Sequence, residues 1–143
     1  MGKEQEREAN KQKGNWYHAE GERYKQEADN VGEKLKRLRT AKKEIELQIN
    51  QLNQLINQFD SFFDQFDTAA DVTAAGWKGE LRKRCEIHSG KAVTSLKSME
   101  NDYQTTLKNI NGEIAKQEAS QLNLLEAAHS CWDMAVSWWN AIV

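Results

Sequence analysis

The sequence predicts an all-α protein, an elongated antiparallel two-helix hairpin with coiled-coil-like packing. Three observations lead to this fold class. The chain of 143 residues has no proline, so nothing in it forces a helix to break. Apolar residues recur every three and four residues through two long stretches, which is the spacing of helices that pack side by side. A short segment with two glycines, Gly76 and Gly79, separates the stretches.

Residues 1–14 carry many charges and show no apolar periodicity. Segments of this composition cannot bury enough apolar surface to order themselves. We therefore expect a flexible lead-in over residues 1–14, and a single helical hairpin over residues 15–143.

The first helix is expected over about residues 15–68. Its apolar row starts at Tyr17, and from Val31 onward only Lys42 interrupts it. The row continues through Leu35, Leu38, Ile45, Ile49, Leu52, Ile56, Phe59, Phe63 and Phe66. A 3.5-residue period kept over this length is typical of coiled coils.

Residues 69–79 interrupt the apolar pattern and contain the tripeptide Trp77-Lys78-Gly79. Asp71 or Thr73 offers a side-chain oxygen that can cap the next helix. We expect a turn over 69–79, with Trp77 covering the end of the apolar stripe and Gly79 allowing a close backbone approach.

A second helix is expected over about residues 80–139. Its apolar row runs through Cys85, Ala92, Leu96, Met99, Tyr103, Leu107, Ile110, Ile114, Leu124, Ala128 and Cys131. The two cysteines would lie about 70 Å apart along one helix, beyond the reach of a disulfide. They are therefore expected to be free thiols.

Neither apolar row can remain in water, so the simplest solution folds the chain back on itself. A bend near residue 75 makes residue i face residue 150 − i. This register brings Trp16, Tyr17 and Tyr24 close to Trp132 at the open end of the hairpin.

One hairpin does not bury all of this apolar surface. Leu47, Leu55 and Phe62 widen the stripe beyond a two-helix contact, and a large exposed apolar patch marks a partner surface. We therefore expect a second hairpin, identical or different, to complete a four-helix bundle. The residues expected to bind this partner are Leu47, Leu55, Phe59, Phe62, Phe63, Phe66, Trp132, Trp138 and Trp139.

The C-terminal segment CWDMAVSWWNAIV is rich in tryptophan and too short to span a bilayer. Three interpretations stay open for it. It closes the open end against Trp16 and Tyr17, it docks a partner through aromatic anchors, or it inserts at a membrane interface.

A turn with Trp77 and Gly79 between two long helices resembles the WXG-type (Esx-like) helical hairpin proteins of bacterial type VII secretion systems. The length of the helices is closest to the long helical partners of LXG-domain toxins. This resemblance implies a partner that is another helical hairpin protein or the N-terminal region of an LXG-type toxin. It also implies a cytoplasmic protein before export, secreted with its partner through the type VII machinery. The family's Tyr-x-x-x-Asp/Glu export signal is absent, since Leu107 follows Tyr103 at that spacing. The partner complex is therefore expected to supply the signal.

Nothing in the sequence indicates an enzyme. It contains no nucleophile elbow, phosphate loop or metal-ligand spacing, so we expect no catalytic residue, metal site or cofactor. A net charge of −2 gives no general attraction to nucleic acid. Six basic residues within ten, Lys34, Lys36, Arg37, Arg39, Lys42 and Lys43, are interpreted as the solvated face of a helix.

Three functions follow in order of preference. The first is a non-enzymatic component of type VII secretion that binds a toxin, an effector or a second hairpin and assists its export. The second is a self-associating coiled-coil structural protein with no role in secretion, in which case the chain forms a homodimer. The third is binding to an anionic surface through the basic residues and the Trp-rich end; membrane and nucleic-acid partners are not expected.

Overall fold

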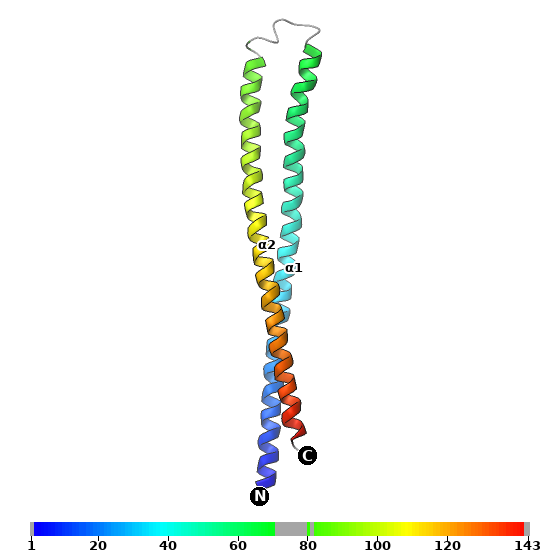
Figure 1. Ribbon diagram of the computed structural model, residues 1–143, viewed down its shortest axis with the longest axis vertical. Coiled ribbons are helices and arrows are strands. Elements are labelled where there is room, and N and C mark those ends of the chain that lie inside the picture. The colour runs from blue at the N-terminus through cyan, green and yellow to red at the C-terminus, as the bar shows by residue number, and fades with distance from the viewer. Residues whose placement is uncertain (1, 71–79, 81, 142–143) are drawn as a thin grey trace. The chain divides into compact units, whose positions relative to one another are not determined.

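The structure, a computed structural model, describes residues 2–70, 80 and 82–141, and the side chains of residues 2–62, 80 and 82–141. Helix α1 spans Gly2–Ala70 and helix α2 spans Arg82–Asn140. The two helices pack against each other with opposite chain directions (Figure 1). The predicted all-α antiparallel hairpin is thus confirmed.

The helix boundaries agree closely with the prediction at three of the four ends. The exception is the start of α1, which lies at Gly2 and not near residue 15. The segment expected to be a flexible lead-in is helical because it consists largely of Glu, Lys, Gln, Arg and Ala, which favour helices even without an apolar row. Residues 71–79, expected as part of the turn, lie outside the described residues, and so do Trp77 and Gly79.

The hairpin divides into two units, which are described separately. Unit 1 combines Met1–Arg39 with Gly112–Val143, and unit 2 comprises Thr40–Asn111. Each unit contains one segment of α1 and one segment of α2, so each is a short antiparallel helix pair.

In unit 1 the helices approach each other through small residues. Ala28 on α1 and Ala128 and Ala135 on α2 are almost completely buried. Gly14 and Gly21 are also buried and lie seven residues apart in one row with Ala28. A methyl group on Gly14 would overlap the indole of Trp139, and one on Gly21 would overlap the indole of Trp132. Both indoles therefore occupy space that only glycine leaves open on α1.

In unit 2 the contact is made by larger aliphatic side chains. Ile49, Leu52 and Ile56 are exposed by only 6–8%, and each contributes roughly 1.5–3 kcal/mol by its removal from water. On α2 the inward row passes through the half-buried Glu100, while Met99 is 46% exposed. The row predicted from the sequence, which included Met99, is shifted by one residue at this point.

The register of the two helices differs from the predicted one. Gly14 lies against Trp139 and Gly21 against Trp132 in unit 1, so residue i faces about residue 153 − i and not 150 − i. Within unit 2, Asn53 lies against Glu100 in the same register. The difference of three residues is almost one helical turn. The prediction assumed a bend centred near residue 75, whereas the glycines and tryptophans of unit 1 fix a different pairing.

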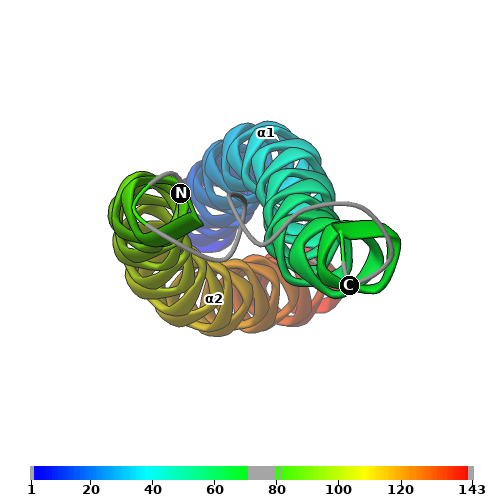
Figure 2. The ribbon, with the colours of Figure 1, turned by 90° about the horizontal axis from the view of Figure 1, so that it is seen from above.

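Among the described residues, no element other than α1 and α2 covers either helix, as the view down the helices shows (Figure 2). Each helix has one neighbour and therefore only one covered face. The side chains on the remaining faces are the ones available to partners.

We predict that alanine has opposite effects at two glycines of unit 1. Apart from its chain neighbours and the nearby backbone of its own helix, Gly112 has no atom within 4 Å of the position that a Cβ atom would take. Gly112→Ala should therefore raise the free energy of unfolding by about 0.5–1 kcal/mol, the usual gain in helix propensity. Gly21→Ala should lower it by about 1–3 kcal/mol, because the methyl group displaces an indole.

Urea unfolding followed by circular dichroism measures both changes. If Gly21→Ala stabilises the protein as much as Gly112→Ala does, Trp132 does not pack on Gly21.

Candidate partner-binding surfaces

An apolar groove lies on α1 within unit 2. Leu55, Gln58, Phe59 and Phe62 line this open groove, which we call the α1 groove. Steps of four and three residues from Leu55 to Phe59 and Phe62 place the three apolar side chains on one face of the helix. The predicted partner-binding residues Leu55, Phe59 and Phe62 are therefore brought together.

The α1 groove borders the helix seam without being covered by it. Leu55 is 41% exposed and Phe62 is 54% exposed, whereas the neighbouring Ile56 is 7% exposed. Since α2 is the only other helix described, the apolar side chains of the groove can still accept the apolar row of another helix. The groove thus has the geometry of a helix-docking site.

Leu47 lies elsewhere on α1. It stands two residues from both Ile45 and Ile49, which are half-buried and buried. Two residues correspond to about 200° around a helix, so Leu47 occupies the opposite face and is 54% exposed. It does not share a surface with the α1 groove. The side chains of Phe63 and Phe66 lie outside the described part of the chain.

The three C-terminal tryptophans pack within unit 1. The indole of Trp139 donates a hydrogen bond to Oδ1 of Asn15 at 3.2 Å, and its ring lies 5.6 Å from that of His18. The ammonium group of Lys13 stands 4.4 Å from the ring centre of Trp138, within cation–π range.

Trp132 completes this internal packing against Gly21. All three tryptophans are half-buried. These contacts favour the interpretation that the Trp-rich segment closes the open end against α1. The α1 residues in these contacts include Gly14, Asn15 and His18, whereas the sequence predicted contacts with Trp16 and Tyr17. The ring of Trp16 instead lies edge-on against that of Tyr17 at 4.9 Å, and Trp16 is 59% exposed.

The indole N–H groups of Trp132 and Trp138 are buried and have no acceptor among the described residues. Packing against α1, on Gly21 and beside Lys13, therefore places these two rings within the described residues.

Beside the helix seam, α2 of unit 1 carries an apolar row that the sequence reasoning missed. Leu122 and Val136 are 58% and 50% exposed, and Leu125 is 36% exposed. Together with Trp132 and Trp139 they follow three-and-four spacing along one face. The sequence contains this spacing, but the predicted apolar row was the neighbouring one that forms the helix seam.

The basic residues near the middle of the chain have acidic neighbours. In unit 1, Arg39 forms an ion pair with Glu118 at 3.0 Å, and Lys34 and Arg37 border a shallow depression together with Glu113. Carboxylates of α2 thus reduce the positive charge of this surface, which weakens the case for an anion-binding site.

Most other charged side chains that are paired have a partner one turn away. Arg23 lies between Glu20 at 2.7 Å and Glu27 at 2.8 Å. The hydrogen bonds that Arg23 donates to Glu20, together with the negative charge of Glu20, raise the pKa of the Arg23 guanidinium above its ordinary value. Such pairs stabilise an exposed helix by only a few tenths of a kcal/mol each, so they mark solvated faces.

Chemistry-bearing side chains are dispersed over both units. Cys85 and Cys131 are free thiols and half-buried. His129 stacks edge-on against Trp132 at 5.4 Å. Among the described residues no three His, Cys, Asp or Glu side chains come together as metal ligands would.

Neither helix, over the residues described, contains a stretch that is both long enough and apolar enough to cross a lipid bilayer. Comparison of the chain with protein-family models, with curated proteins and with solved structures finds no match.

We predict that two adjacent residues of unit 2 differ sharply in their contribution to stability. Ile56→Ala should lower the free energy of unfolding by about 2–5 kcal/mol because Ile56 lies in the helix seam. Leu55→Ala should lower it by less than about 1 kcal/mol because the α1 groove is open. Thermal unfolding of the two variants at equal concentration provides the measurement, and equal losses would show that the groove is filled in the isolated chain.

Proposed function

We propose that this chain is a non-enzymatic component of type VII secretion. It binds the N-terminal helical region of an LXG-type toxin, or a second hairpin, and assists the export of that partner. The resulting complex is a four-helix bundle, in which the partner supplies two helices and the export signal.

The observation that carries this proposal is the α1 groove. A helix pair that serves only as a spacer has no need for an apolar groove in which Leu55 and Phe62 are 41% and 54% exposed. A row with this spacing, next to a helix seam, fits the apolar face of an added helix. Covering Leu55 and Phe62 would bury side chains that are now about half exposed.

The turn motif adds support of a different kind. Trp77 and Gly79 stand in the sequence between the end of α1 and the start of α2. This is the position that the W-x-G motif takes in the hairpin proteins that the chain resembles. The cytoplasmic location before export and the release with the partner both depend on this resemblance.

A second candidate function is a self-associating structural protein without a role in secretion. Leu47 favours it, because this exposed residue lies on the face opposite the helix seam and outside the α1 groove. A chain that binds one toxin through one groove leaves Leu47 without a use.

We predict that Leu55→Lys disrupts the complex with the proposed partner. When the chain is co-expressed with the helical or toxin protein encoded next to it, the two should purify together as a stable complex. Placing a charge in the groove, with loss of the leucine contact, should weaken this complex about 10–100-fold.

Met134→Lys is the matched control, since Met134 is 42% exposed and Leu55 is 41% exposed, but Met134 belongs to unit 1. It should leave the affinity within about twofold of the unaltered chain, well under a 1.4 kcal/mol change. A chain that never forms a complex with the proteins encoded beside it would refute the proposed function.

A further inference from the structure

The middle of α1 has an unusual composition. Residues 47–59 contain thirteen consecutive residues with no charge, all of them Leu, Ile, Phe, Asn or Gln. Charged residues make up 29% of the whole chain. A helix that meets water on three sides normally carries charges there, so this segment is adapted to further contacts.

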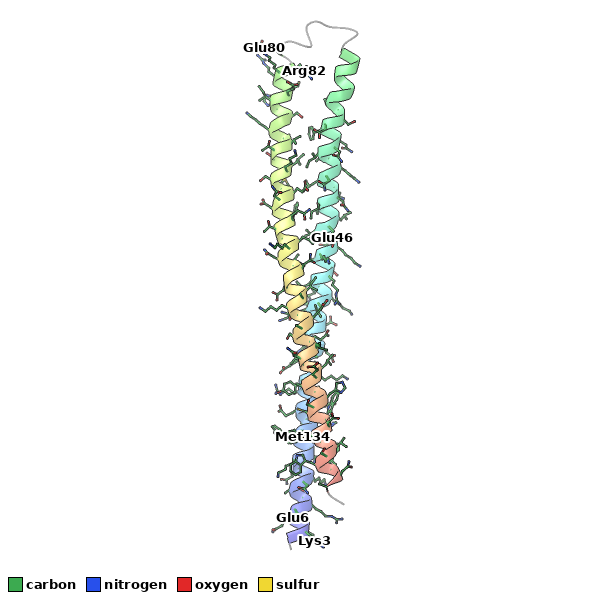
Figure 3. All side chains as sticks on the ribbon, viewed as in Figure 1. Lys3, Glu6, Glu46, Glu80, Arg82 and Met134 are labelled. Carbon is green, nitrogen blue, oxygen red and sulfur yellow. The ribbon has the colours of Figure 1, made fainter. Side chains whose placement is uncertain are left out.

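The asparagines of this segment occupy one face. Asn50, Asn53 and Asn57 follow three-and-four spacing, and the same spacing extends to Lys43 and Glu46 before them and to Asp60 after them. We call these six residues the asparagine strip: Lys43, Glu46, Asn50, Asn53, Asn57 and Asp60. All six are exposed and belong to unit 2, and Glu46 is labelled in Figure 3.

The strip and the α1 groove lie on opposite sides of the buried row of α1. Asn50 follows Ile49, whereas Leu55 precedes Ile56. One residue is a rotation of about 100° in either direction. A partner in the groove therefore leaves the strip open.

The charges of the strip lie toward its two ends. Lys43 and Glu46 begin it and Asp60 ends it, with the three asparagines between them. Along the sequence the same spacing continues to Lys36 and Arg39 before the strip and to Asp64 and Asp67 after it. Apart from Glu46, the row therefore changes from basic to amide to acidic along the helix.

This arrangement differs from the solvated faces of the chain. Arg23 and Arg84, for example, pair with glutamates three or four residues away. Within the described part of the chain, Lys43, Glu46 and Asp60 form no ion pair. Asn53 also contacts α2: with its amide nitrogen turned toward Glu100, it donates hydrogen bonds of 2.9 and 3.1 Å to the two carboxylate oxygens.

We propose that the asparagine strip binds the same strip of a second copy of this chain, with the two α1 helices antiparallel. In this arrangement residue i faces residue 103 − i of the second copy. Lys43 then faces Asp60, Glu46 faces Asn57, and Asn50 faces Asn53. A twofold axis between the copies produces each of these pairs twice.

Each pair is chemically complementary. An ammonium group meets a carboxylate, an amide N–H₂ donates to a carboxylate, and two amides each offer a donor and an acceptor. A parallel arrangement would instead bring Lys43, Glu46 and Asp60 against their own kind. The strip therefore selects one orientation and one register.

Leu47 gives this interface an apolar component. It lies four residues after Lys43 and three before Asn50, hence directly beside the strip, and it is 54% exposed. The contact with the second copy reduces its exposure. The proposed self-association does not depend on a role in secretion, since it uses a face that the α1 groove leaves free.

Charge reversal tests the interface. In sedimentation velocity at low salt the full-length chain should form a dimer that dissociates as the salt concentration rises. Lys43→Glu should weaken the dimer about tenfold or more, because two attractive pairs become repulsive. Lys108→Glu is the matched control: Lys108 is exposed on α2 of the same unit, and its reversal should leave the dimer unchanged.

Mixing two variants provides the rescue. Lys43→Glu and Asp60→Lys should each be impaired alone, yet an equal mixture should associate as the unaltered chain does, since every facing pair is again of opposite sign. Circular dichroism of each variant confirms that the helices are intact. A monomeric unaltered chain, equal effects of Lys43→Glu and Lys108→Glu, or a mixture without rescue would each overturn the inference.

Cross-linking tests the orientation in a chain that also carries Cys85→Ser and Cys131→Ser. Asn50→Cys mixed with Asn53→Cys should give a disulfide-linked mixed dimer faster than either variant alone. Faster linkage between identical variants indicates a parallel pair and would refute the antiparallel arrangement. Toxin binding is measured separately with Leu55→Lys, so the failure of one proposal leaves the other intact.

Discussion

The packing of two indoles on two glycines fixes the register of unit 1. Helices approach closely where their facing residues are small, and a large ring can cross the seam only where the opposite backbone has no side chain. Trp132 and Trp139 stand seven residues apart, as do Gly21 and Gly14, so both contacts form in a single register. A slip of the helices by one residue would place an indole on a side chain. This steric clash therefore restricts the register more than the spacing of the apolar row does.

The two-helix architecture has a second physical consequence. A helix with one neighbour has about one face covered. In unit 2, however, α1 carries apolar or uncharged residues over a wider arc of its surface. The α1 groove lies on one side of the buried row and the asparagine strip lies on the other. The groove is apolar, so burying it would contribute mainly to the affinity for a partner helix. The strip is polar, so its pairs would mainly determine the orientation of a second copy. The two flanks of a single helix thus differ in the type of neighbour that they favour.

Much of this fold could be predicted from the sequence, because heptad spacing over Val31 to Phe66 leaves few alternatives to a long helix. The register could not, since the apolar rows alone permit several pairings and the selection lies in Gly14 and Gly21. Spacing by seven in both the glycines and the tryptophans was the available signal. It was missed because residues 1–14 were interpreted as a lead-in. Of the expected partner-binding residues, Leu55, Phe59 and Phe62 share a surface, but Leu47 does not, because it lies at the centre of the outer face between Ile45 and Ile49.

The tryptophans also have an optical consequence. Four of the five, Trp16, Trp132, Trp138 and Trp139, belong to unit 1, and no tryptophan lies among the described residues of unit 2. Trp16 is largely in contact with water, whereas the other three are held against α1. Indole emission therefore reports mainly on the opening of the helix ends in unit 1. The protein carries a built-in fluorophore for that unit, and the surfaces of unit 2 can be altered without changing its immediate surroundings.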